Sequence, residues 1–190
     1  FDIFSRIDSV YAATDLVGGI WAFDWKLVNL AHGNFGQLFA GNIFYPLQNA
    51  SLLNENPLSQ ALLSIPIYWL TGDSYYCYQW SIYMSYWLSS LGMFLLARNL
   101  GLNAWGALGA SLIFAFNGYR YGISPYAHQS TMQWMPFTLI FINKYFENNI
   151  RSNLYWAAVF YCLQITASAV YFILFSNFLF FFVFIKLYIN

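Results

Sequence analysis

The sequence predicts an all-α integral membrane protein, in which a polytopic bundle of transmembrane helices follows a large external loop with amphipathic interfacial helices. Charged residues make up only 7% of the 190 residues, while hydrophobic residues make up 60% and aromatic residues 23%. An average soluble domain has roughly 25% charged residues. Between Tyr75 and Ile185 only five side chains are charged. They separate long uncharged blocks, which suit the bilayer core because a spanning helix needs roughly 20 apolar residues.

We expect two regions, with residues 1–74 forming the external loop and residues 75–190 forming the bundle. The chain begins at Phe1 without a methionine and stops at Asn190 just after an apolar run. We therefore expect a fragment of a longer protein, with an upstream first span and a downstream part missing. The net charge is zero, so composition gives no reason to expect nucleic acid as a partner. The lipid bilayer is the partner that the composition predicts.

Within the external loop the pattern predicts two helices. Leu16–His32 alternates a broad apolar surface with polar positions, as a helix lying at the membrane interface does, and Gly33 is expected to end it. An irregular stretch rich in Asn and Gly follows over Asn34–Pro57. A shorter helix containing a proline is expected over Leu58–Leu70, and the turn Thr71–Asp73 leads into the first span.

The spans follow from the uncharged blocks, which are Tyr75–Ala97, Ala104–Tyr119, Tyr121–Asn143 and Ser152–Ile185. In the third block we expect the helix over Gln129–Phe146, with a kink at Pro136. The last block would be roughly 51 Å long as one helix, which is too long for one span. We expect it to break near Thr166–Val170, where small and polar residues cluster. The resulting prediction is about five spans.

Orientation follows from the basic residues. The connections on one side of the predicted bundle carry Arg98, Lys144, Arg151 and Lys186, and the positive-inside rule places such residues in the cytoplasm. Residues 1–74 and Arg120 then lie on the external side. The charge pattern predicts an integral protein of the plasma membrane, and the resemblance described next implies a bacterial one.

Two groups of residues carry a resemblance to a known family. The external loop contains Asp15, Trp21, Trp25, Asn29, Leu30, His32, Gly33, the run Asn42–Pro46, Pro57, Leu58, Ile65–Tyr68, Thr71 and Gly72. The bundle contains Ala115–Arg120, His128 and Gln133–Pro136. Together they resemble the bacterial polytopic glycosyltransferases of the GT-C superfamily.

The resemblance implies a cell-envelope transferase that moves a hexosyl or pentosyl group from a polyprenyl-phosphate donor to a glycan, lipid or protein acceptor. Transfer would take place on the external face. Many members of the family need no tightly held cofactor, and some use a divalent metal. Mg or Mn is therefore a candidate cofactor, and Asp15 and Glu55 are its candidate ligands.

Glycosyl transfer by inversion needs a carboxylate that takes the proton of the acceptor, and donors that hold the leaving lipid phosphate. The resemblance places Asp15 at the acid of the family's loop, as the general base; the alternative is that Asp15 caps the N-terminus of its helix. Glu55 is expected to contact the acceptor or a metal, or to be an ordinary loop residue. Asp24 reads as a solvated residue or one paired with a lysine.

Five further residues are candidates for binding the phosphate or the sugar. Arg120 suits bidentate contact with phosphate, although an interfacial guanidinium reaching toward water is the alternative. His128 is expected on the same external connection, either on the ligand or as a capped loop histidine. Gln129 and Gln133 share a helix face, where they either line the site or bond to neighbouring helices. His32 is a ligand contact or a residue of the interface.

Two other functions remain open on the sequence alone. A transporter of lipid or polysaccharide usually has charged residues at mid-membrane depth, and the predicted spans have none. A non-catalytic assembly or scaffold subunit would carry the same apolar pattern. Replacing Asp15 and Arg120 separates the enzyme from the scaffold, because only the enzyme should lose turnover.

Overall fold

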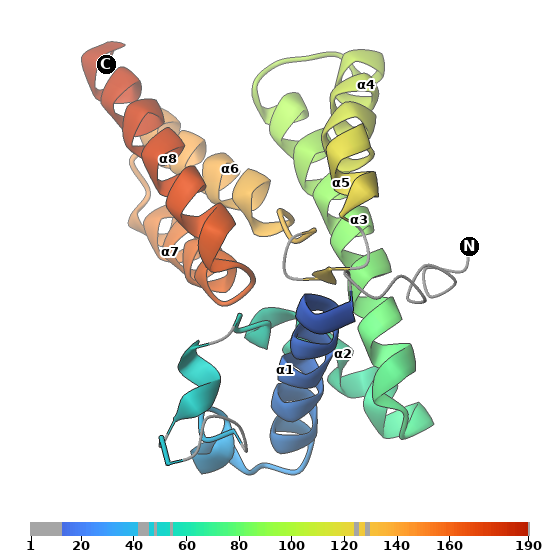
Figure 1. The fold of residues 1–190 in the computed structure, drawn as a ribbon. Coiled ribbons are helices and arrows are strands. Elements are labelled where there is room, and N and C mark those ends of the chain that lie inside the picture. The colour runs from blue at the N-terminus through green and yellow to red at the C-terminus, as the bar shows by residue number, and fades with distance from the viewer. Residues whose placement is uncertain are drawn as a thin grey trace.

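The computed structural model describes residues 13–41, 46–47, 49–53, 55–123, 126–127 and 130–189. Every regular element in these ranges is a helix, which confirms the all-α prediction (Figure 1). The α-helices are α1 (Ala13–Ala31), α2 (Leu58–Thr71), α3 (Ser74–Asn99), α4 (Ala104–Ala115), α5 (Gly118–Gly122), α6 (Trp134–Asn148), α7 (Arg151–Ile165) and α8 (Ala169–Ile189). Two 3₁₀ helices, η2 (Phe35–Gln37) and η3 (Ala50–Leu53), lie between α1 and α2.

The two helices expected in residues 1–74 are present with bounds close to the predicted ones. Gly33 follows α1 with a φ of +74°, and Gly72 ends α2 with a φ of +66°. Glycine enters this left-handed region without the steric cost that a Cβ adds. Asp73 then caps α3, because its side chain accepts the N–H of Tyr75 at 2.8 Å. The chain therefore turns from α2 into α3 within two residues.

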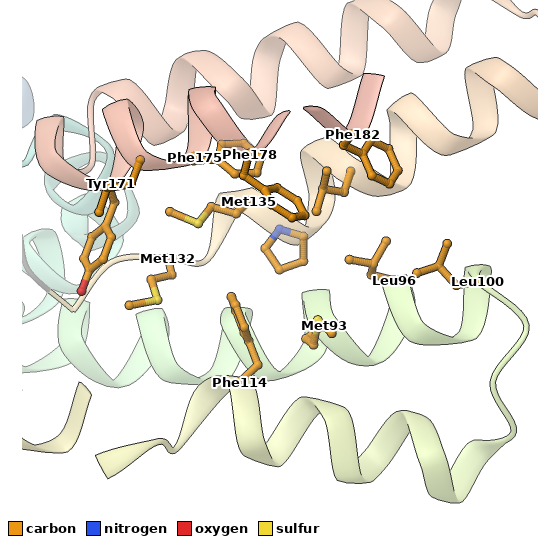
Figure 2. Close-up of a pocket in the computed structure, with 13 residues that line it drawn as sticks. Met93, Leu96, Leu100, Phe114, Met132, Met135, Tyr171, Phe175, Phe178 and Phe182 are labelled. Atoms are coloured by element: carbon orange, nitrogen blue, oxygen red, sulfur yellow. The ribbon is translucent and has the colours of Figure 1, made fainter. Parts of the chain in front are cut away.

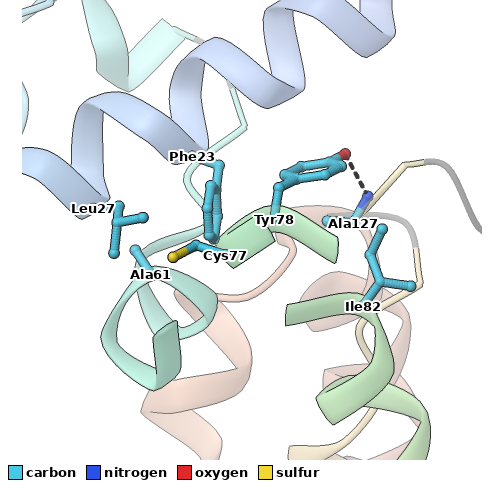
Figure 3. Packing of buried hydrophobic residues seen from close by; sticks show 7 residues of the cluster. All are labelled: Phe23, Leu27, Ala61, Cys77, Tyr78, Ile82 and Ala127. Atoms are coloured by element: carbon cyan, nitrogen blue, oxygen red, sulfur yellow. Dashed lines mark hydrogen bonds between the residues drawn. The ribbon is translucent and has the colours of Figure 1, made fainter. Parts of the chain in front are cut away.

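A first hydrophobic cluster joins α1 and α2 to the beginning of α3 (Figure 3). Its buried members are Phe23, Leu27, Ala61, Cys77, Tyr78, Ile82 and Ala127. The ring of Tyr78 meets the edge of Phe23 at 5.4 Å between centroids, and its hydroxyl accepts the N–H of Ala127 at 3.0 Å. The loop region is thus packed against the bundle and does not hang free of it.

The predicted spans are all helical, but two of them are shorter than expected. Helix α4 has 12 residues where 16 were predicted, and α6 begins at Trp134, not at Gln129. Pro136 falls in the first turn of α6, where a missing N–H costs nothing, so the expected kink inside a longer helix does not arise. The break in the last block is confirmed, since α7 ends at Ile165 and α8 begins at Ala169.

Among the described residues only α8 is both long and apolar enough to cross a membrane, over Ala169–Tyr188. Helix α3 has the length, with 26 residues, but its serines and tyrosines lower its hydropathy. The predicted count of five spans is therefore not confirmed.

A second hydrophobic cluster lies among α3, α6 and α8, and its buried members are Leu96, Leu139, Ile140 and Phe175. Near the same end, the side chain of Asn143 on α6 donates to Asn99 on α3 at 3.0 Å. Figure 1 shows the α3–α4 connection and the end of α8 on one side of the molecule, with α1 and α2 on the other. The bundle therefore has one end formed by the α3–α4 connection and the end of α8, and another end that packs against α1 and α2.

Candidate functional site

Arg120 lies where the bundle meets the loop region. The short helix α5 presents it, and Asn117 caps that helix by accepting the N–H of Arg120 at 2.9 Å. The side chain is completely buried. Its Nε donates to the carbonyl of Ser130 at 2.8 Å, Nη1 to the carbonyl of Ala115 at 3.2 Å, and Nη2 to Ser85 Oγ at 2.7 Å. The guanidinium is held by three separate segments and does not reach toward water as one alternative predicted.

Tyr86 on α3 supports Arg120 in two ways. The guanidinium carbon lies 4.2 Å from the centroid of the tyrosine ring, and the tyrosine hydroxyl donates to the carbonyl of Arg120 at 2.9 Å. No Asp or Glu among the described residues forms an ion pair with Arg120. Burial lowers the pKa of Arg120 to about 10, so the group still carries its charge at neutral pH. A buried cation in this setting favours an anionic ligand.

Gln133 adds a second hydrogen-bond donor beside Arg120. It is completely buried, and its Oε1 accepts the hydroxyl of Ser85 at 2.9 Å. Its Nε2 has no hydrogen-bond partner in the described part of the chain. Because Ser85 also accepts from Arg120, the two predicted residues are linked through one serine. The structure thus brings Arg120 and Gln133 together.

An apolar cavity of about 450 Å³ lies between α3, α4, α6 and α8. Carbon and sulfur side chains, including Met93, Phe114, Met132 and Phe178, form almost all of its lining. Figure 2 shows Tyr171 at one end and Leu100 with Phe182 at the other. The cavity has the size of a small-molecule site and the lining of a site for a hydrocarbon chain.

Tyr171 is the polar residue of this cavity. Its buried hydroxyl lies within hydrogen-bonding reach of the Tyr119 side chain. It is also close enough to Arg120 for the two groups to interact electrostatically. The cationic side of the site therefore lies at the Tyr171 end of the cavity.

Next to the segment Ser130–Gln133, polar groups of the loop region meet the α7–α8 connection. The carbonyl of Thr131 accepts Gln164 Nε2 at 2.9 Å, and the carbonyl of Ala167 accepts Gln60 Nε2 at 3.0 Å. The carboxylate of Glu55 accepts the N–H of Ala169. Burial raises the pKa of Glu55, and this N–H bond opposes the rise. Glu55 therefore lies against the beginning of α8.

The remaining predicted residues are placed as follows. His32 is exposed at the far end of α1, where its Nδ1 pairs with the carbonyl of Val28 at 2.8 Å, so the structure does not bring it to the site. The backbone of Asp15 lies in the first turn of α1, while its side chain lies outside the described part. His128 and Gln129 also fall outside the described residues. Asp24 forms no pair with Lys26, whose ammonium instead donates to Leu38 and Ser51.

Sequence reasoning missed Ser85, Tyr86 and Tyr171. One signal for Ser85 was available, because Ser81, Ser85 and Ser89 repeat every four residues and so share one face of α3. Nothing in the sequence marked Tyr86 or Tyr171 among the chain's 16 tyrosines.

Comparison with known proteins adds no assignment, since no family model, no curated protein and no solved structure matches this chain.

Proposed function

We propose that this protein is an integral membrane glycosyltransferase that moves a sugar from a polyprenyl-phosphate donor to an acceptor on the external face. The observation that carries the proposal is a buried arginine without a carboxylate partner in the described part, next to the polar end of an apolar cavity. A polyprenyl phosphate has matching chemistry, with an anionic head at the end of a hydrocarbon chain.

In this reaction the acceptor hydroxyl attacks the anomeric carbon of the donor, and the bond from that carbon to the phosphate oxygen breaks. Arg120, Gln133 Nε2 and the Tyr171 hydroxyl would hold the phosphate as its charge increases. Asp15, by the resemblance, would take the proton of the acceptor. No three His, Cys, Asp or Glu side chains of the described residues come together at a metal site, so the proposal assigns no residues to a divalent metal.

The membrane part of the proposal is supported by the surface. The outward side chains of α4 and α8 include Ile113, Phe180 and Leu187, which are 75%, 67% and 65% exposed. Apolar patches of this kind mark contact with lipid or protein. Arg98, Lys144, Arg151 and Lys186 lie near the end of the bundle where Asn99 bonds to Asn143 and α8 terminates. This is the distribution that the positive-inside rule describes for a cytoplasmic face.

The test is an assay of the purified protein in nanodiscs with radiolabelled polyprenyl-phosphate sugars and membrane acceptors. Tyr171→Phe keeps the aromatic ring and gives up the interaction of the hydroxyl with Tyr119, so it should still fold. It should lower the transfer rate by about 10- to 100-fold, as loss of a hydrogen bond to a charged group does. Asp15→Asn should abolish transfer. Tyr155→Phe, an exposed tyrosine of α7, is the matched control and should transfer like the wild type.

Each result has a distinct meaning. Equal transfer by Asp15→Asn and wild type would remove Asp15 from catalysis while the transferase proposal stands. Normal transfer by Tyr171→Phe would place the lipid phosphate elsewhere. If the folded wild type transfers no sugar from any donor, the protein is a scaffold or a transporter and the proposal is wrong.

A further inference from the structure

The connection between α7 and α8 gathers buried side-chain oxygens that have no donor among the described residues. Gln164 Oε1 and Ser168 Oγ both belong to this group, and both side chains are at least 98% buried. A third such oxygen, Asn56 Oδ1, lies beside Glu55 in the chain. A buried acceptor without a donor is unfavourable, so each one calls for an explanation by a ligand or another donor.

The chemical identity of these groups is fixed by their neighbours. Gln164 Nε2 donates to the carbonyl of Thr131 at 2.9 Å, so the other atom of that amide is the acceptor oxygen and not the nitrogen. The N–H of Ser168 donates to the carbonyl of Gln164 at 3.2 Å. Both residues therefore lie in the same final turn of α7 and the start of the connection.

Glu55 and the beginning of α2 are held against the same connection. The N–H of Ser59 donates to the carbonyl of Thr166 at 3.1 Å, and Gln60 Nε2 donates to the carbonyl of Ala167 at 3.0 Å. Glu55 accepts the N–H of Ala169. Two backbone carbonyls of the connection are thus satisfied, while Gln164 Oε1 and Ser168 Oγ have no hydrogen-bond partner among the described residues. Gln164 Oε1 and Asn56 Oδ1 can only accept, whereas the Ser168 hydroxyl can both donate and accept, so the amide oxygens are the surplus acceptors.

Oxygens that lack a donor favour a ligand that donates hydrogen bonds or carries a positive charge. Either a hard cation or the hydroxyl groups of a carbohydrate would satisfy oxygens of this kind. The cation is disfavoured because Glu55 meets the N-terminus of α8, where the partial charge of the helix dipole is positive. No third His, Cys, Asp or Glu in the described ranges joins Glu55 to complete a metal site. The hydroxyl groups of a sugar meet neither objection.

We propose that Glu55, Gln164 and Ser168 bind the hydroxyl groups of an uncharged carbohydrate. This inference rests on the proposed function, in which the carbohydrate is the acceptor. The Ser130 carbonyl accepts from Arg120 and the Thr131 carbonyl accepts from Gln164, so two consecutive residues hold the two groups. The donor phosphate and the acceptor sugar would meet beside these two residues, as attack of the acceptor hydroxyl on the anomeric carbon requires.

The experiment measures sugar binding without any lipid donor. The protein in nanodiscs is titrated with the methyl glycosides of glucose, galactose, mannose and N-acetylglucosamine, and binding is followed by saturation-transfer NMR. Ser168→Ala removes a hydroxyl that bonds to no described residue, so it should keep the thermal melting temperature. Glu55→Gln keeps the shape of the side chain. Ser111→Ala is the matched control, a buried serine of α4 that donates only to its own helix at Leu108.

We expect at least one glycoside to bind the wild type and the Ser111→Ala protein equally, and to bind Ser168→Ala and Glu55→Gln about three- to tenfold more weakly. The proposal is overturned if no glycoside binds the folded wild type, or if both variants bind like the wild type. Magnesium or calcium chloride, titrated separately, overturns it if the cation binds the wild type and Glu55→Gln abolishes that binding.

The two proposals fail separately. Sugar binding that depends on Glu55 and Ser168, in a protein that transfers no sugar from any donor, would leave this site standing and remove the transferase. Sugar transfer that is unaffected by Ser168→Ala and Glu55→Gln, without glycoside binding here, would leave the transferase standing and move its acceptor elsewhere.

Discussion

Lys26 and Arg120 are both completely buried cations, and neither forms an ion pair with a described residue. Lys26 donates to the carbonyl of Leu38 and to Ser51 Oγ, and its ammonium lies 4.8 Å from the centroid of the Phe39 ring. It thereby attaches the stretch after α1 to the inner face of that helix. Arg120 does the same for α5 and the segment at Ser130. Each of these two buried cations therefore fixes a non-helical segment by donating hydrogen bonds to its backbone carbonyls.

Lys26 makes the attachment of this stretch dependent on pH. Burial lowers the pKa of Lys26 from 10.5 to about 8. Between these two values the unfolded chain binds a proton that the folded chain does not, so the free energy of unfolding should rise with pH from about 8 to about 10.5, by at most about 1.4 kcal/mol per pH unit. Below pH 8 both states are protonated and this contribution is constant. Hydrogen exchange of the residues around Leu38 measures it.

Lys26→Met is the control for that measurement, because it keeps the length of the side chain and cannot titrate. Its exchange rates, corrected for intrinsic pH dependence, should not change between pH 8 and 10.5. A wild type that shows no slope in this window, or a Met variant that shows the same slope, would contradict the role of Lys26.

Close approach of helices is decided at the scale of elements, and Gly92 is the point where α3 meets α6. A Cβ added at Gly92 would lie 2.9 Å from Phe137 Cε2 and 3.2 Å from Pro136 Cβ. The Phe137 ring stacks on Phe160 at 5.1 Å between centroids, so it has little freedom to move away. Because Met93 and Pro136 both line the apolar cavity, this contact also sets the width of the cavity.

Gly92→Ala should therefore lower the free energy of unfolding by about 1–3 kcal/mol, as overpacking does. Gly109 on α4 is the matched site, since a Cβ added there meets nothing within 4 Å. Gly109→Ala should leave stability unchanged or raise it by up to about 1 kcal/mol through helix propensity. Denaturant titration in detergent micelles compares the two. Equal changes in the free energy of unfolding for the two variants would show that Phe137 moves aside without destabilising the protein.

Local signals explain which elements could be predicted. Gly72 and Asp73 end one helix and begin the next within a few residues, and the small residues near Ala167 break the last apolar block. The start of α6 could not be predicted from such signals, because the mixed polar and apolar residues before Pro136 fit a helix and an irregular segment equally well. The structure starts α6 at Trp134, whose indole N–H donates to Ser59 at 3.3 Å.

The candidate site was less predictable than the elements. Arg120 and Gln133 were identified as polar residues near one end of the bundle, but their link through Ser85 joins residues 35 and 48 positions apart. Such contacts depend on how α3 packs against α5 and α6. The cavity next to Tyr171 likewise exists only after four helices have packed.

For the whole molecule, the two ends of the bundle should lie on opposite sides of the membrane. The four basic residues collected near the α6–α7 turn predict that this end is cytoplasmic. In a protein whose two cysteines are replaced by alanine, Leu70→Cys should react with a membrane-impermeant maleimide in intact cells. Ile150→Cys should react only after the cells are permeabilised. Both positions are exposed, at 83% and 52%.

The cysteine-free protein controls for background labelling. The reverse pattern would place residues 58–71 in the cytoplasm and contradict a reaction on the external face. Labelling of both positions in intact cells would mean that the helices between them do not separate the two ends.

The neighbouring carbonyls of Ser130 and Thr131 should couple the binding of two ligands. One peptide unit fixes the arginine and the next fixes Gln164, so a ligand that shifts either group displaces backbone shared with the other. Binding of a phosphate at Arg120 should then change the affinity for a sugar at Gln164. Binding of the sugar must change the affinity for the phosphate by the same factor. Titrating a methyl glycoside with and without saturating polyprenyl phosphate measures that factor. A factor above one would mean that each ligand strengthens the binding of the other through two consecutive residues, and a factor of one would mean that they bind independently.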